Sequence, residues 1–471
     1  MKWGVINSES GFILPKKSRP GKPFDKPSFE LFHQSLIRDA GENGFPFAVS
    51  KFDQVRISGD SVHFHLQFKT GPSVIWDSIA ISGPDKIPGR LLSASTGIVR
   101  GSRYREDKFL GVKDRLSSLA FLELTSDPAV VFTANGAVLM LAVKKKKANR
   151  ANLLVAIQPK PSGTGYFPVG EANMEFNNLI NQGERINFEW KSFGGGSQRT
   201  LFQVKAPYLL QSPFGIITGV RIQKQDSTFS SFMPEVGALY SLNANSEMSL
   251  TYGLMRSGFG RNNTETIKNI SERRLTLSYR LSSTDRTINP TKGWLIKTQL
   301  GTGQKQSEKY LSDFDDKTST SATNQLHVNF SVAKFSRLTP RWVVFTMANV
   351  GLISNKEEQL YLSEMYRLGG LNTLRGQDEE SIFTPSYEGG TLEIRYLLDR
   401  VTNIHVFADG KRIRSPYYNG GKTSLPLGVG TGFSFGTGGM IFTLDYAIGT
   451  NSQGQFLLRN NRIHMGFSGS F

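Results

Sequence analysis

The chain closes with Arg462-Ile463-His464-Met465-Gly466-Phe467-Ser468-Gly469-Ser470-Phe471, in which two kinds of side chain alternate. Alternate residues of a β-strand lie on opposite faces of the sheet. One face would carry Ile463, Met465, Phe467, Gly469 and Phe471, and the other would carry Arg462, His464, Gly466 and two serines. An apolar face against lipid and a polar face toward water are typical of a transmembrane β-barrel. This stretch therefore predicts the last strand of such a barrel.

The same alternation occurs in many short segments after residue 150. Residues 185–191, 326–332 and 392–396 each place apolar side chains at every second position, with polar or charged ones between them. We predict sixteen strands in residues 151–471, which leaves about ten residues for each membrane crossing. The predicted fold is mainly β: a 16-stranded transmembrane antiparallel β-barrel preceded by an α+β region.

The predicted connections alternate between short and long. Short turns are expected at Asn181–Glu184 and Ser336–Pro340, among others, and long loops at Ser257–Glu272, Gln304–Thr323 and Ser354–Tyr387. Tight turns at one end and long loops at the other are the pattern of an outer-membrane barrel.

The composition excludes several other classes of protein. Only 38% of the residues are hydrophobic, and no run approaches the roughly 18 apolar residues of a membrane helix. Because the chain has no cysteine, it has neither a disulfide framework nor a thiol-based metal site or nucleophile. The net charge of +17 is spread over strands, turns and loops without a basic helix or patch, so we expect no nucleic-acid partner.

The first 150 residues are organised differently and contain an internal repeat. Residues 73–150 are predicted to form a β-α-α-β-β domain, with strands at 74–82, 129–134 and 137–144 and helices at 88–95 and 105–119. Residues 1–72 resemble a partial copy of it. Since no apolar export signal follows Met1, we expect the chain to be truncated at its N-terminus. The barrel would then occupy residues 151–471.

A glycine-rich motif lies in the longest predicted loop, Ser354–Tyr387. It reads Gly369-Gly370-Leu371-Asn372-Thr373-Leu374-Arg375-Gly376-Gln377. Together with the strand number, the repeated domain, the turn Asn289-Pro290-Thr291-Lys292-Gly293 and the terminal Phe471, this motif resembles the BamA/TamA superfamily of outer-membrane assembly proteins. The repeated units resemble the POTRA domains of that family.

The resemblance implies a non-enzymatic protein of a Gram-negative outer membrane, without cofactors and with its POTRA modules in the periplasm. Its partners would be unfolded outer-membrane or secreted polypeptides, outer-membrane lipids and accessory lipoproteins. The modules would receive clients by strand addition to exposed sheet edges. The basic run at residues 144–147 would meet anionic lipid head groups.

The resemblance also implies a pairing inside the barrel. In the family, the arginine of the loop folds into the lumen and pairs with acids on strands 12 and 13, and the matching residues here are Arg375, Glu393 and Asp409. Alternation supports this pairing independently, because Glu393 lies between the outward residues Leu392 and Ile394. Gly376 completes the Arg-Gly motif, whereas Gln377 replaces the usual aromatic and leaves the packing of the loop tip open.

A second implied site is a lateral seam between the first strand, residues 152–158, and the last. Its residues would be Leu153, Leu154, Gly466, Phe467 and Gly469. The two glycines remove side-chain packing from the seam and would make it easier to part. The terminal Phe471 would be the signal by which the protein is itself delivered to the membrane.

Two other functions remain open on the sequence. A secretion pore of the two-partner type would thread a polypeptide through the lumen, and a passive solute channel would need no client. Catalysis has little support: Gly432-Phe433-Ser434-Phe435-Gly436 matches a nucleophile elbow, but it lies within a predicted strand. His63 and His65 share one strand face without further ligands, so we expect no catalytic residue and no metal.

Overall fold

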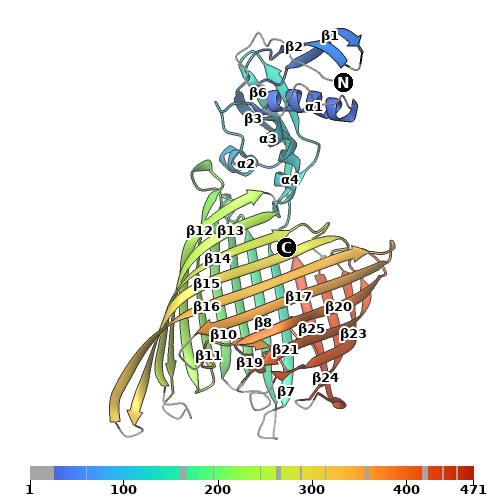
Figure 1. Ribbon diagram of the computed structural model, residues 1–471. Helices are drawn as coiled ribbons and strands as arrows, with labels where there is room; N and C mark the ends of the chain where they lie inside the picture. The colour runs from blue at the N-terminus through green and yellow to red at the C-terminus, as the bar shows by residue number, and fades with distance from the viewer. Residues whose placement is uncertain are drawn as a thin grey trace. The chain divides into compact units, whose positions relative to one another are not determined.

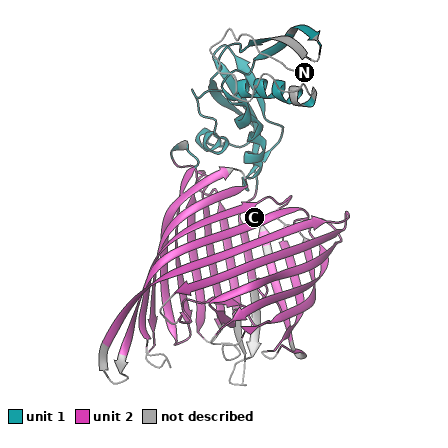
Figure 2. Cartoon of the chain, viewed as in Figure 1, with its two compact units in different colours: residues 1–146, 210–213 teal, residues 147–209, 214–471 magenta. Residues whose placement is uncertain are grey.

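The computed structural model describes residues 26–470 except residues 60, 160–165, 195, 244, 261–266, 287–288, 313–314, 356–359, 416–422, 438–439 and 452–453. The chain divides into two compact units, residues 1–146 with 210–213 and residues 147–209 with 214–471 (Figure 2). The first unit is a mixed α+β unit, and the second is a β-barrel.

The first unit begins with helix α1 (Lys26–Glu42) and the antiparallel hairpin of β1 (Val49–Ser58) and β2 (Ser61–Lys69). Leu36 and Ala40 of the helix are buried against Leu66 and Phe68 of the hairpin. Spacing of i and i+4 puts the two helix residues on one face, which is why α1 packs here.

The rest of this unit has one central strand. Strand β6 (Gly136–Lys145) runs parallel to β3 (Trp76–Ser82) and antiparallel to β4 (Leu122–Leu124) and β5 (Ala129–Thr133). The helices are α2 (Gly89–Thr96), α3 (Glu106–Leu110) and α4 (Val112–Ser117). Trp76, Leu92, Leu116 and Leu139 are buried and form the core. No helix among the described residues is long and apolar enough to span a bilayer.

The predicted helix 105–119 is two short helices. The break falls at Gly111, whose ψ of −7° departs from the α-helical value. Glycine is among the poorest helix formers, so the chain turns there at low cost. Strand β4 was not predicted, because three residues carry too little alternation to be recognised.

The second unit is a closed antiparallel barrel of sixteen strands, which confirms the predicted fold (Figure 1). Each strand pairs with the next, and β25 closes the ring by pairing with β7. The strands are β7 (Arg150–Pro159), β8 (Tyr166–Asn177), β9 (Arg185–Gly194), β10 (Ser197–Ala206), β11 (Phe214–Gln225), β12 (Phe229–Asn243), β13 (Ser246–Phe259), β14 (Ile267–Ser282), β15 (Gly293–Ser312), β16 (Asp315–Arg337), β17 (Trp342–Asn355), β20 (Ser386–Leu397), β21 (Asn403–Arg414), β23 (Leu427–Thr437), β24 (Met440–Thr450) and β25 (Phe456–Ser470). The short strand β22 (Thr423–Ser424) also pairs with β21.

Alternation along each strand separates an outer apolar face from a polar lumen. On β20, Leu392 is 50% exposed on the outside, whereas its neighbour Glu393 is 5% exposed on the inside. Strand β21 shows the same period, with its exposed and buried residues alternating from Asn403 to Arg414. The outer face therefore suits lipid and the inner face suits water.

Two of the predicted long loops are largely strand. Residues 304–312 of β15 and 315–323 of β16 form the outer part of a long hairpin, with Lys309 opposite Ser319 (Figure 1, yellow). Most of Ser257–Glu272 also belongs to strands, because β13 reaches Phe259 and β14 starts at Ile267. Both segments are rich in polar residues on both faces, so they lack the apolar alternation that marks a membrane crossing.

The core of the first unit gives a test of its packing. Trp76 is fully buried, and its ring lies 5.0 Å from that of Tyr104. Trp76→Ala should destabilise this unit by about 3–5 kcal/mol, because it leaves a large cavity. Limited proteolysis of the whole protein in increasing urea would measure the midpoint of this unit. Val131→Ala, at a 48% exposed position, should leave that midpoint nearly unchanged. Equal midpoints for both variants would contradict the assigned core.

Candidate functional site: a loop bound inside the barrel

A folded loop connects β17 to β20 and lies against the inner face of the barrel. We call its described residues, 360–385, the inner loop. It contains two short antiparallel strands, β18 (Tyr366–Leu368) and β19 (Ile382–Thr384). Leu368, Leu374 and Ile382 are buried together with Ile413 of β21. The inner loop is therefore packed onto a barrel strand through an apolar core of its own.

Arg375 of the inner loop binds the two acids expected from the sequence. Its Nε and Nη2 donate to the two oxygens of Asp409 over 2.8 and 3.0 Å, and its backbone N–H also donates to Asp409 over 3.0 Å. Its Nη1 donates to Oε2 of Glu393 over 2.8 Å. The guanidinium carbon lies 3.4 Å from the centre of the Phe407 ring. Such a planar fork, paired and stacked at once, is geometry that lysine cannot reproduce.

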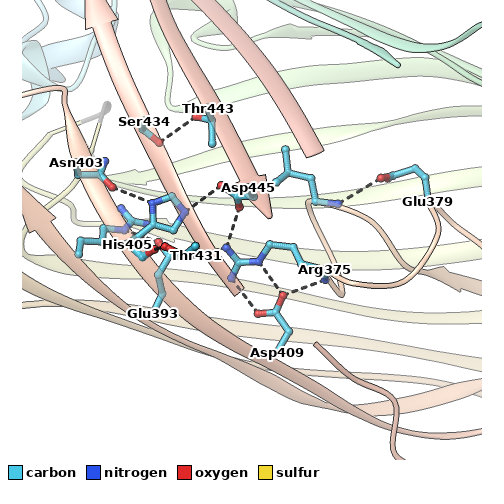
Figure 3. Close-up of polar contacts among 12 residues, drawn as sticks. Arg375, Glu379, Glu393, Asn403, His405, Asp409, Thr431, Ser434, Thr443 and Asp445 are labelled. Carbon is cyan, nitrogen blue, oxygen red and sulfur yellow. Dashed lines mark hydrogen bonds and ion pairs between the residues drawn. The ribbon is translucent and has the colours of Figure 1, made fainter. Parts of the chain in front are cut away.

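A third acid completes the group. Asp445 of β24 accepts from Nη1 of Arg375 over 3.3 Å, and its other oxygen lies 3.1 Å from Nε2 of His405 (Figure 3). Nδ1 of His405 lies 3.1 Å from Oδ1 of Asn403. We refer to Arg375, Glu393, Asp409 and Asp445 as the arginine cluster. Asp445 was missed from the sequence, although its alternation with the outward residues Leu444 and Tyr446 could have indicated an inward carboxylate.

The charges of the arginine cluster are nearly removed from water. The side chains of Arg375, Glu393, Asp409 and Asp445 are 2–8% exposed. Glu393 also accepts from Nε of Arg395 over 2.7 Å, so a second cation helps to compensate the negative charge of the three carboxylates. Removing one partner from a buried ionic group leaves uncompensated charge and is strongly destabilising. The inner loop is therefore held by its charge as well as by its packing.

Glycines let the loop backbone approach the wall. Gly376 adopts φ +84°, a left-handed conformation that favours glycine. A side chain at Gly428 of β23 would collide with the carbonyl of Arg375, and one at Gly449 of β24 would collide with Gly376. Gln377 donates from Nε2 to the carbonyl of Thr450 over 2.8 Å. The amide thus fixes the loop tip where the family motif has an aromatic ring.

The seam between β7 and β25 is the shortest junction of the described barrel. Four residue pairs join the two strands, including Phe467 with Leu153 and Gly469 with Ala151. By contrast, β7 forms ten pairs with β8, and β25 forms ten with β24. Leu154 and Gly466 follow directly on the last pair and have no partner across the seam among the described residues.

A cavity joins the seam to the arginine cluster. Its volume is about 390 Å³, and Leu153, Gly466 and Phe467 line it together with Arg375 and Asp445. The structure thus brings the two groups of predicted site residues to a common space. Phe471 lies outside the described residues.

The two remaining motifs singled out from the sequence both lie in β-strands. Gly432–Gly436 lies within β23, which continues as a strand and not into a helix. His63 and His65 belong to β2, and their side chains lie outside the described part of the structure. Among the described residues, no group of three or more histidines and acids is arranged to hold a metal ion.

These features define a class of protein: a transmembrane β-barrel of the outer-membrane type, with a loop bound inside its lumen by an arginine. The Omp85 superfamily domain matches residues 181–471, more than half of the chain, so this chain belongs to the Omp85 superfamily. This confirms the family resemblance inferred from the sequence. The protein is an outer-membrane barrel of a superfamily that acts in protein insertion or transport.

Solved structures share the fold at low identity. BamA from Haemophilus ducreyi lacking POTRA domains 1–3 is 12% identical with a TM-score of 0.53, and the match covers 96% of this chain and 95% of that one. CdiB from Acinetobacter baumannii is 11% identical, with a TM-score of 0.63 and coverage of 96% and 83%. CdiB from Escherichia coli is 12% identical, with a TM-score of 0.60 and coverage of 95% and 85%. No match was found among curated proteins.

The arginine cluster predicts the effect of losing its cation. Arg375→Ala should leave the barrel closed but release the inner loop, because three buried carboxylates lose their shared partner at a cost of about 3–5 kcal/mol. Protease sensitivity of residues 360–385 in the folded barrel would report the release. Arg412→Ala is a matched control, because its pair with Glu388 on the same sheet is exposed and worth little. An inner loop as resistant in Arg375→Ala as in the control would contradict this assignment.

Proposed function

We propose that this protein inserts unfolded polypeptides into an outer membrane by opening the seam between β7 and β25. The observation that carries the proposal is the length of that junction, with four residue pairs where each flanking junction has ten. The two strands have long stretches beyond those pairs, Leu154–Pro159 of β7 and Phe456–Gly466 of β25. Opening would therefore break few backbone hydrogen bonds of the barrel.

An open seam supplies its own driving force. In hydrocarbon each unpaired backbone group costs several kcal/mol, so an exposed strand edge gains free energy by pairing with a client strand. Gly466 and Gly469 add no side-chain packing to the junction, which lowers the barrier to parting it. The chemistry is pairing and release of backbone groups, so the proposed activity is non-enzymatic and needs no cofactor.

The first unit fits the role of a client receptor in the periplasm. Its part from β3 to β6 follows the strand-helix-helix-strand-strand order of a POTRA domain, with the second helix divided into α3 and α4 and with β4 as an additional short strand. Strand β5 pairs only with β6 in the described sheet. The free edge of β5 offers backbone donors and acceptors for strand addition by an unfolded client. Accessory lipoproteins would bind the same unit, and the lysines at 144–147 would contact anionic lipid head groups.

A secretion pore of the two-partner type is the second candidate. A second cavity of about 810 Å³ lies in the lumen, lined by polar and charged residues of β9–β16 and by the inner loop. A polypeptide threaded through the lumen would pass this space. The two functions differ in whether the wall of the barrel has to part.

A disulfide across the seam separates the two candidates. Leu153→Cys with Phe467→Cys places the new thiols on paired residues, and the chain has no other cysteine. Disulfides need Cα atoms about 4.4–6.8 Å apart, a spacing that paired strands provide. Oxidation should abolish insertion of an outer-membrane client into vesicles, and reductant should restore it, because the seam can no longer open.

A permanent junction supplies the control. Leu392→Cys with Ala408→Cys bridges β20 and β21, and its oxidation should leave insertion intact. Full activity with a quantitatively bridged seam would refute insertion through the wall. If a secreted client also crossed the membrane at the normal rate, the secretion pore would replace insertion as the function.

A further inference from the structure

The inner loop carries three consecutive acids, Asp378, Glu379 and Glu380, which bind basic side chains on both sides of the seam. Asp378 pairs with Arg462 of β25 through two contacts of 2.6 and 3.1 Å. Glu379 pairs with Lys191 of β9 over 2.5 Å, and Glu380 pairs with Arg199 of β10 over 2.8 Å. The loop therefore bridges the last strand of the barrel and its third and fourth strands, β9 and β10.

This bridge lies beside the unpaired part of the seam. Lys191 is directly opposite Glu171 of β8, and Glu171 is directly opposite Leu154 of β7. Leu154 is the first residue of β7 beyond the four seam pairs. Arg462 is likewise in the part of β25 that has no partner on β7 among the described residues. Ionic contacts of the loop thus reach β25 on one side of the unpaired part of the seam and β9, two strands from the edge strand β7, on the other.

The contacts on the two sides differ in burial. The side chains of Lys191 and Glu380 are 10% and 8% exposed, so their charges interact in a poorly screened environment. The pair of Asp378 with Arg462 is largely exposed, and pairs of that kind contribute little. On the side of β25, the loop is instead held by Arg375, which binds β20, β21 and β24.

The two sides also differ in which ionic partners the charged residues would keep after the loop separates from the barrel strands. If the loop left β9, Lys191 would keep Glu171, whose Oε2 lies 3.2 Å from its Nζ. Glu380 would keep Arg367 of the loop itself, at 3.9 Å. If the loop left the other side, three buried carboxylates would lose Arg375. Separation at β9 and β10 would leave Glu379 with the backbone N–H of Leu371 and Arg199 with the ring of Phe193. Because separation on the other side would take the shared arginine from three buried carboxylates, separation at β9 and β10 is the cheaper of the two.

We propose that Glu379 and Glu380 are positioning residues that latch the seam shut through Lys191 and Arg199. The inference rests on the proposed opening of the seam and adds how it is controlled. When the seam opens, these pairs break, Lys191 turns to Glu171, and the inner loop moves with β20–β25. In the open state the inner loop stays bound to the strands of the C-terminal half of the barrel and is separated from β9 and β10.

Spin labels can test the latch without any client. Cysteines at Ala172 of β8 and Met465 of β25 flank the seam, and the chain has no native cysteine to interfere. Lys191→Glu should give a several-fold larger population at long label distance, because it repels Glu379 and Glu380. Adding Glu379→Lys should return the distribution toward that of the parent, because the pair is restored with its charges exchanged.

Lys297→Glu is the matched control. It makes the same change of charge on the lumenal side of β15, where the charged neighbours of Lys297 are Arg280, Glu189 and Lys205, all on barrel strands. It should leave the label distances unchanged. If Lys191→Glu does not fold, Glu379→Gln with Glu380→Gln tests the same pairs from the loop. Unchanged distances in the latch variants, or an equal effect of the control, would overturn the latch.

This test is independent of the function itself. If the disulfide-bridged seam stays fully active while Lys191→Glu still widens the distances, the latch stands and the insertion mechanism fails. If the bridged seam is inactive while the latch variants leave the distances unchanged, the insertion mechanism stands and the latch is wrong.

Discussion

The structure depends on one constraint, which is that hydrocarbon offers no partner to a backbone N–H or C=O group. Sixteen strands therefore close into a ring, in which each strand pairs its backbone with a neighbour on both sides. Among the described residues, each junction other than the seam has at least eight residue pairs, whereas β25 and β7 share four. A ring of this kind has a defined weakest point. Its position between the first and last strands means that parting it leaves one continuous sheet.

The inner loop compensates for this weak point from inside the lumen. It can do so because Gly376, Gly428 and Gly449 let its backbone touch the wall, and because four charged side chains meet with little water between them. Neither the glycines nor the charged side chains alone would hold the loop on the wall. A loop without the glycines could not bring Arg375 to its acids, and one without the charges would rest on a small apolar core. Close backbone approach and buried ionic contacts therefore act together in holding the loop on the wall.

Much of this arrangement could be predicted from the sequence. Alternation of apolar and polar residues identified the strands and placed Glu393 and Asp409 on their inward faces, and the family motif singled out Arg375. These signals could be used because each depends only on residues that are close together in the sequence. Asp445 and Lys191 were missed, since their roles depend on loop contacts from 70 and 188 residues away along the chain. The outer part of the hairpin of β15 and β16 was predicted as a loop because a ribbon outside the membrane needs no apolar face. Backbone pairing holds it, and backbone pairing is not encoded by residue type.

The long-range character of the arginine cluster also couples folding of the loop to formation of the sheet. Arg375 precedes Glu393, Asp409 and Asp445 by 18, 34 and 70 residues. A nascent sheet that ends before β24 can offer the arginine only two of its three carboxylates. The cluster is complete only when β20, β21 and β24 are all part of the sheet. Docking of the loop therefore depends on three strands of the C-terminal half of the wall, and the folded loop and that part of the wall form together.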